Sequence, residues 1–174
     1  FTSNRVGTKQ QVYDRLKEQI ELKKYLIEVK EIQEFAKLLA YIRQHKKVIA
    51  KPAASNQGKG IYSFEIIDQN FVIKNLDQMR QCNEDEFEKF FKDELKSGFG
   101  FNFSPFITSE THLGQSTVFR LHMTRGEEGK WKKIKFFPYV NLNKDVDITN
   151  GMQGALITTR EKLFLEQFYP KAHE

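Results

Sequence analysis

The chain has 174 residues, 39% of them hydrophobic and 29% charged, which is ordinary for a soluble globular protein of one domain with at most a second small lobe. No stretch is apolar for long enough to form a transmembrane helix, so the composition excludes a protein that crosses a membrane in this way. The net charge of +5 comes from 28 basic and 23 acidic residues, which are interspersed as on solvated helix faces.

The first residues are polar and lack the apolar segment of a secretory signal peptide, and the chain does not begin with Met. We therefore expect a cytoplasmic protein of which this sequence is a fragment. A reducing compartment agrees with the single cysteine, Cys82, which excludes an intramolecular disulfide and a cysteine-rich zinc site. Its polar and partly acidic neighbours do not favour a thiolate, so we interpret Cys82 as a structural thiol.

Two helices are predicted at the start of the chain. Val12, Leu16 and Ile20 recur at helical spacing, which predicts a helix from about Thr8 to Tyr25. A one-sided apolar stripe from residue 35 to residue 42 predicts a second helix, and the basic run after it suits a helix C-terminus. A short strand at 48–51 follows.

The rest of the chain is dominated by predicted strands. Residues 61–67 and 71–76 indicate a hairpin with a turn at 68–70, and the apolar spacing over 87–95 indicates a third helix. Residues 99–107 alternate as a strand does, residues 118–125 and 131–142 predict a hairpin around a turn at 126–129, and residues 163–170 predict a short helix or an extended segment. Hairpins outnumber strand–helix–strand crossovers, which predicts an α+β fold.

The most informative segment is the loop after the strand that ends at Lys51. Pro52 stiffens its start, and the loop contains Ser55, Gly58, Lys59 and Gly60. Glycines let backbone amides approach phosphate oxygens, consecutive amides form an anion-binding nest, and lysines add positive charge. The spacing is not that of a Walker A loop, and the loop leads into a strand. From these residues alone, a phosphate-binding loop and a surface hairpin loop remain equal alternatives.

A resemblance favours the first alternative. KPAASNQGKGI, at 51–61, resembles the KPxxGSxGKGI segment of the spore-coat-associated YheC/YheD-type ATP-grasp proteins, which are similar to the ATP-binding domain of glutathione synthetase. In that family a strand lysine, here Lys51, and the glycine-rich flap hold the phosphates of ATP. One glycine of the family segment is missing here. The opening SNRVGTKQQVYDRL is similar too, and the resemblance places Lys9 in the nucleotide pocket.

FNFSPFI resembles the family's strand whose backbone binds adenine, which it assigns to Pro105, Phe106 and Ile107. Ser104 replaces the usual glutamine, and Pro105 has no N–H to donate. DITNGMQGA resembles the family's SNLxxGG segment, in which Asn150 matches.

VFRLHMTRGEEGKWKK resembles the family's DFRVxxQRxxxGxW and assigns Arg120 to the phosphates, although Val118 replaces the usual aspartate. We expect Arg120 to be buried or to face a pocket, where its guanidinium needs a partner. We favour phosphate over Glu127 or Asp147 in this role. Trp131 is interpreted as a packing residue.

The resemblance implies an ATP-grasp core over residues 1–174, with an N-terminal lobe at 1–100 that carries the glycine loop and part of a C-terminal lobe at 101–174. Each lobe would be an antiparallel sheet with helices, and the lobes would enclose the nucleotide. The implied ligands are ATP and Mg²⁺. The implied reaction is ATP-dependent ligation, in which a carboxylate of an unknown small molecule or peptide is phosphorylated and then attacked by an amine or a thiol.

The sequence departs from the family at its end. The metal-binding ExN motif is not found, so we expect the C-terminal metal-binding part to be missing and leave the metal ligands unknown. Asp145, Asp147 and Asn150 could gather around Mg²⁺, but a solvated loop is the preferred interpretation. A non-catalytic nucleotide-binding module therefore remains an alternative, and so does a basic scaffold or nucleic-acid-binding protein, which would bind any polyanion in a salt-sensitive way. We expect neither a membrane partner nor, by preference, nucleic acid.

Overall fold

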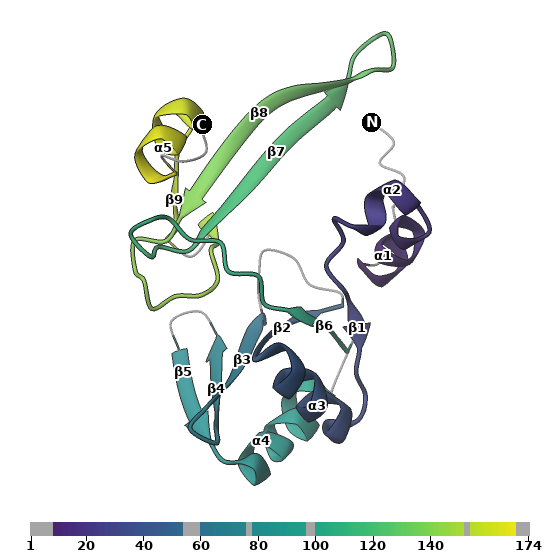
Figure 1. The fold of residues 1–174 in the computed structure, drawn as a ribbon, viewed down its shortest axis with the longest axis vertical. Coiled ribbons are helices and arrows are strands. Elements are labelled where there is room, and N and C mark those ends of the chain that lie inside the picture. The colour runs from purple at the N-terminus through teal and green to yellow at the C-terminus, as the bar shows by residue number, and fades with distance from the viewer. Residues whose placement is uncertain (1–8, 54–59, 76–77, 97–99, 152–153, 170–174) are drawn as a thin grey trace. The chain divides into compact units, whose positions relative to one another are not determined.

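The structure of the protein is a computed structural model, and it describes residues 9–53, 60–75, 78–96, 100–151 and 154–169 (Figure 1). The chain divides into two compact units, Phe1–Phe106 and Ile107–Glu174. Each unit combines helices with its own antiparallel sheet, which confirms the predicted α+β class. Within the described residues, no helix combines the length and the apolar character needed to span a bilayer.

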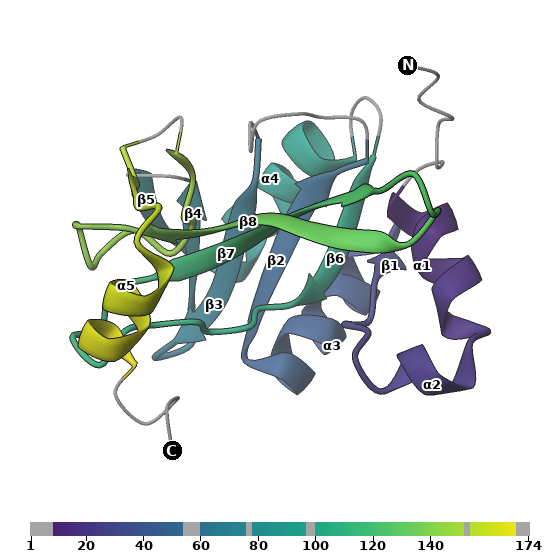
Figure 2. The ribbon, with the colours of Figure 1, turned by 90° about the horizontal axis from the view of Figure 1, so that it is seen from above.

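The first unit is built on a six-stranded antiparallel sheet with the order β1-β6-β2-β3-β4-β5. Figure 2 shows β6, β2, β3 and β4 side by side. The strands are β1 (Lys30–Glu31), β2 (Lys47–Pro52), β3 (Tyr62–Ile67), β4 (Asn70–Asn75), β5 (Gln78–Cys82) and β6 (Phe101–Pro105). The predicted hairpin turn is confirmed, because Asp68 and Gln69 both have positive φ, as a tight two-residue turn requires.

Helices cover one face of this sheet (Figure 1). They are α3 (Phe35–His45) and α4 (Glu84–Phe90), the second of which continues as a π-helical turn, η1 (Phe91–Leu95). Asn83 starts α4 with a capping box, since its side chain accepts from the backbone N–H of Glu86 while the Glu86 side chain accepts from the Asn83 N–H. The core is aromatic, and the rings of Phe71 and Phe87 stack with their centres 4.6 Å apart.

The helix predicted from about Thr8 to Tyr25 is interrupted. The structure contains α1 (Lys9–Lys17) and a single helical turn, α2 (Ile20–Lys23), separated at Gln19, whose φ of −85° and ψ of 106° are extended. Ile20, the last residue of the apolar pattern, is 90% exposed. Ile20 is therefore not packed against a core that would stabilise a continuous helix at this point. The prediction of a single helix was wrong.

The second unit contains a three-stranded antiparallel sheet and one helix. The strands are β7 (Thr117–Arg125), β8 (Trp131–Val140) and β9 (Leu156–Ile157), in that order, and the helix is α5 (Glu161–Phe168). The predicted hairpin of β7 and β8 is confirmed, with a register shift at His122/Met123. Helix α5 packs on it through Phe164, which is buried and lies edge-on to Phe119.

The sequence pattern did not reveal β1, β5 and β9. β1 and β9 each have two residues, and β5 has the polar sequence QMRQC. These strands are held by backbone hydrogen bonds to a neighbour rather than by an apolar face, so no alternation marks them. β6 was predicted as a strand, and the structure adds its partners, β2 and β1.

Candidate functional site

The pairing register divides the side chains of the first sheet between two faces. Val48, Ala50 and Phe64 face the core beneath α3 and α4, together with Phe103 from β6. Because side chains alternate along a strand, the residues between them face the opposite way. We call this opposite face the polar face, and on the four central strands it consists of Lys47, Ile49, Lys51, Ser63, Glu65, Ile67, Asn70, Val72, Lys74, Asn102 and Ser104.

Lys51 lies on the polar face near the end of β2. Its side chain is half-buried, and its direct cross-strand neighbour is Asn102 on β6. The pairing of β2 with β6 continues just past Lys51, where the N–H of Ala53 donates to the carbonyl oxygen of Gly100 at 3.0 Å. Lys51 therefore stands on a rigid strand immediately before the glycine-rich segment.

Of the four loop residues singled out from the sequence, Gly60 lies within the described part of the chain. Ser55, Gly58 and Lys59 lie outside the described residues. Gly60 has a φ of +69°, a conformation that side chains other than glycine's adopt at a cost. A Cβ atom at this position would lie 3.2 Å from Cγ of Pro52, closer than an ordinary contact. The positive φ and the close approach to Pro52 both favour a glycine where the loop returns to β3.

The exit of β6 carries the three residues assigned to adenine binding. The N–H of Phe106 donates to the carbonyl oxygen of Lys47 at 3.0 Å, so Phe106 is tied to β2. Backbone groups alternate along an extended chain, which directs the carbonyl of Pro105 and the N–H of Ile107 away from β2. On that side β1 pairs with Asn102 and Phe103 and does not extend to Pro105. Because β1 does not extend to Pro105, the missing N–H of Pro105 costs no hydrogen bond to β1.

The position of Phe106 is reinforced by a charged neighbour. Nζ of Lys47 lies 4.5 Å from the centre of the Phe106 ring and 3.6 Å from a carboxylate oxygen of Glu65. These contacts join β3, β2 and the chain just beyond β6 on the polar face. Lys47 was not selected from the sequence, where it belongs to a basic run at a helix end.

Arg120 is in a different environment from the one predicted. It lies on β7 in the second unit with an exposed side chain, and its guanidinium carbon is 5.0 Å from the centre of the Tyr139 ring. Of the two placements expected for Arg120, burial of the guanidinium is not observed, whereas its facing a pocket stays a prediction. Trp131 is also exposed and stacks with Arg125, contrary to the packing role expected for it.

Asn150 lies at the end of a loop that another asparagine organises. The buried Asn141 donates through Nδ2 to the carbonyl oxygens of Val146 and Ile148, both at 3.1 Å. The carbonyl of Asn150 accepts from the N–H of Ala155 at 3.2 Å. Within the described part of the chain, no group of three or more His, Cys, Asp or Glu side chains could hold a metal ion.

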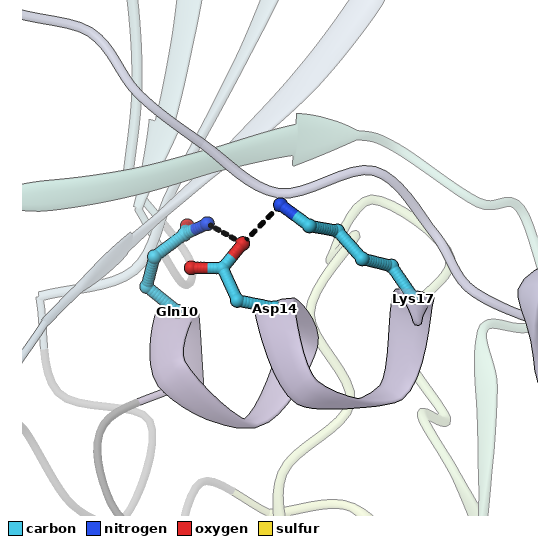
Figure 3. Close-up of polar contacts among 3 residues, drawn as sticks. All are labelled: Gln10, Asp14 and Lys17. Atoms are coloured by element: carbon cyan, nitrogen blue, oxygen red, sulfur yellow. Dashed lines mark hydrogen bonds and ion pairs between the residues drawn. The ribbon is translucent and has the colours of Figure 1, made fainter. Parts of the chain in front are cut away.

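Lys9 is the first residue of α1, and its side chain lies outside the part of the molecule that the structure describes. The nearby acidic group on this helix is Asp14, whose carboxylate accepts from Lys17 and, at 3.2 Å, from Gln10 (Figure 3). The hydrogen bond from Lys17 lowers the pKa of Asp14, so the carboxylate is held in its charged form. The first turn of α1 contains no acidic residue.

Cys82 is buried in the core of the first unit, and this burial raises the pKa of its thiol. A neutral thiol is a poor nucleophile, which confirms the structural interpretation.

A comparison with known families identifies the chain. The model of the family described as YheC/D-like ATP-grasp matches residues 1–174, the full sequence. The chain belongs to this family. No curated protein and no solved structure matches it significantly. Membership in the ATP-grasp family indicates ATP binding, usually with Mg²⁺, and a ligase-like function.

The donors of the polar face fit the ligand that the family indicates. Lys51 offers positive charge for phosphate, and the exit of β6 offers a backbone acceptor and donor for a base. Lys51 and Pro105 lie on adjacent strands, β2 and β6, whose register is defined. The match with the family therefore agrees with the chemistry that the sheet displays.

Proposed function

We propose that the chain is the ATP-binding domain of an ATP-dependent carboxylate–amine or carboxylate–thiol ligase, and that ATP binds on the polar face of the first sheet. The observation that supports this most strongly is the register of β2 and β6. It brings Lys51 on β2 next to β6, the strand that ends at Pro105. The family match supports the same ligand.

Adenine is proposed to bind at the exit of β6. The carbonyl of Pro105 would accept a hydrogen bond from the N6 amino group, and the N–H of Ile107 would donate to N1. Both groups are directed away from β2, while Phe106 between them is tied to Lys47. A backbone edge of this kind selects a base that presents a donor next to an acceptor. Adenine presents such a pair, because its N6 amino group lies next to N1.

The phosphates are proposed to bind to Lys51 and to the segment that contains Ser55, Gly58, Lys59 and Gly60, with Lys9 and Asn150 as further contacts. Lys51 supplies a point charge from a rigid strand, whereas the glycines supply backbone N–H groups. Closure of residues 55–60 over the phosphates would exclude water from the reacting group. The glycine conformation of Gly60 supports this role for the segment.

The proposed reaction has two steps. A carboxylate oxygen of the substrate attacks the γ-phosphorus, the bond to the oxygen that bridges to the β-phosphate breaks, and ADP leaves. An amine or thiol then attacks the acyl phosphate, forms the amide or thioester, and releases phosphate. Positioning and positive charge are what a protein contributes to phosphoryl transfer. Arg120, exposed on β7, is proposed to stabilise the charge on the transferring group.

The test is calorimetric titration of the full chain with ATP at moderate salt, in the presence of Mg²⁺ and in the presence of EDTA. Loss of a charged contact to phosphate costs roughly a factor of 10–100 in affinity, so Lys51→Ala should weaken ATP binding by about that amount. Lys37→Ala is the matched control, since Lys37 is an exposed lysine on α3, which covers the other face of the sheet. It removes the same charge and should leave ATP binding unchanged.

Failure of the folded wild-type chain to bind ATP would contradict the proposal. Equal losses in Lys51→Ala and Lys37→Ala would instead indicate non-specific attraction of a basic protein for a polyanion. A non-catalytic nucleotide-binding module is the second candidate, and Val118, which stands where the family has an aspartate, favours it. That candidate predicts equal affinity for ATP with Mg²⁺ and with EDTA.

A further inference from the structure

Asn102 on β6 is a buried amide without a partner among the described residues. Its side chain belongs to a residue that is 4% exposed, and neither Oδ1 nor Nδ2 has a hydrogen bond. Leaving buried polar atoms unpaired is costly, and most buried polar side chains in folded proteins are paired. A leucine or valine would fill a buried strand position without this cost. The unpaired Oδ1 and Nδ2 atoms of Asn102 therefore indicate that this side chain binds a ligand.

The position of Asn102 in the sheet indicates the class of this ligand. It lies on the polar face, with Lys51 directly opposite on β2 and Glu31 directly opposite on β1. Ser104, two residues further along β6, shares this face, and the edge formed by Pro105 and Ile107 follows at once. Asn102 thus stands between the proposed phosphate lysine and the proposed adenine edge.

The donor and the acceptor of the amide group limit which chemical group Asn102 can bind. Phosphate oxygens accept hydrogen bonds and could satisfy Nδ2 but not Oδ1, while the ammonium of a lysine could satisfy Oδ1 but not Nδ2. Both atoms are satisfied together by a planar group with a donor and an acceptor side by side. The N6 amino group and N7 of adenine form such a pair, and asparagine binds this edge with two hydrogen bonds in protein–DNA complexes.

We propose that Asn102 binds the N6/N7 edge of the adenine base, with Oδ1 accepting from the N6 amino group and Nδ2 donating to N7. This rests on the proposed function, because it takes the nucleotide to lie on the polar face. The N6 amino group has two hydrogens, one for the carbonyl of Pro105 and one for Asn102. Guanine has an acceptor, O6, in place of this donor and is rejected by both oxygens. Asn102 is thus a specificity-determining residue.

The experiment compares ATP with 7-deaza-ATP, in which a C–H group replaces N7. Removing one hydrogen bond of this kind changes affinity by about tenfold, so the wild-type chain should bind ATP about tenfold more tightly than 7-deaza-ATP. Asn102→Leu should bind the two nucleotides with equal affinity. Asn70→Leu is the control, because Asn70 lies in the same sheet and its Nδ2 hydrogen-bonds the carbonyl of Asp68 in the turn. It should keep the wild-type preference.

Two different failures can be told apart. A wild-type chain that binds neither nucleotide contradicts the proposed function. A wild-type chain that binds both nucleotides equally overturns the role of Asn102, and so does an Asn102→Leu variant that keeps the preference for ATP. The comparison of the two nucleotides on the wild-type chain needs no variant, so it decides the question even where a substitution prevents folding.

Discussion

At the scale of single residues, the glycines of the first unit separate two kinds of backbone requirement. Gly60 and Gly100 both have positive φ, at 69° and 74°. At Gly60 an added Cβ would crowd Pro52, whereas at Gly100 it would meet nothing within 4 Å. The two positions therefore share the conformational cost of a side chain and differ in the steric cost.

This difference makes a stability prediction. Gly100→Ala should destabilise the chain by about 1–2 kcal/mol, the cost of the left-handed conformation for an L-residue. Gly60→Ala should destabilise it by more, since its Cβ also displaces the ring of Pro52. Urea denaturation of both variants measures the two values. Equal values would mean that the ring of Pro52 yields without cost.

At the scale of elements, β6 connects the core to the proposed adenine edge. Phe103 faces the core, Asn102 and Ser104 face the other way, and the hydrogen bond of Phe106 fixes the direction of the next backbone group. The side chain of Ile107 is 60% exposed, so it contributes little to the packing of the protein. Its backbone N–H and its side chain can therefore be tested separately.

Ile107→Pro removes the N–H but leaves the carbonyl of Pro105 in place, and it should weaken ATP binding by about tenfold, the worth of one buried hydrogen bond. Ile107→Ala keeps the N–H and should bind ATP within about twofold of the wild type. Titration calorimetry measures both. If the two substitutions weakened binding equally, the side chain of Ile107 rather than its N–H would be the contact. Circular dichroism checks that the proline variant is folded.

At the scale of the whole molecule, the chain consists of two units with separate sheets. The core of the first unit is formed by residues between Ile32 and Phe103, so none of it comes from the second unit. A unit with its own core unfolds as a cooperative domain. This organisation predicts how a shortened chain behaves.

A fragment of residues 1–106 should fold by itself. We expect a single sigmoidal urea transition, and protection of Cys82 from alkylation until that transition, because its thiol is buried in the same core. Fluorescence or circular dichroism measures the transition, and mass spectrometry measures the alkylation. Rapid alkylation of Cys82 in the native fragment would show that the first unit needs the second to form its core. The matched control is the full chain under the same conditions.

The sequence by itself determined the family and most of the elements. Amphipathic spacing predicted α3 and the helix at 87–95, and turn residues predicted both hairpins, because these signals depend on neighbours a few positions apart. The family resemblance rested on short motifs in a characteristic order, and the family match confirmed it.

The tertiary structure decided everything that depends on which strands are neighbours. The register of β2 and β6 places Lys51 opposite Asn102 and leaves the edge at Pro105 and Ile107 unpaired by β1, and no local pattern in the sequence contains this pairing. The exposure of Arg120 and the break between α1 and α2 were missed for the same reason, since a strand or helix pattern does not reveal what covers it. Burial is a property of the assembled sheet, and so is the unpaired amide of Asn102, which an isolated strand would expose to water.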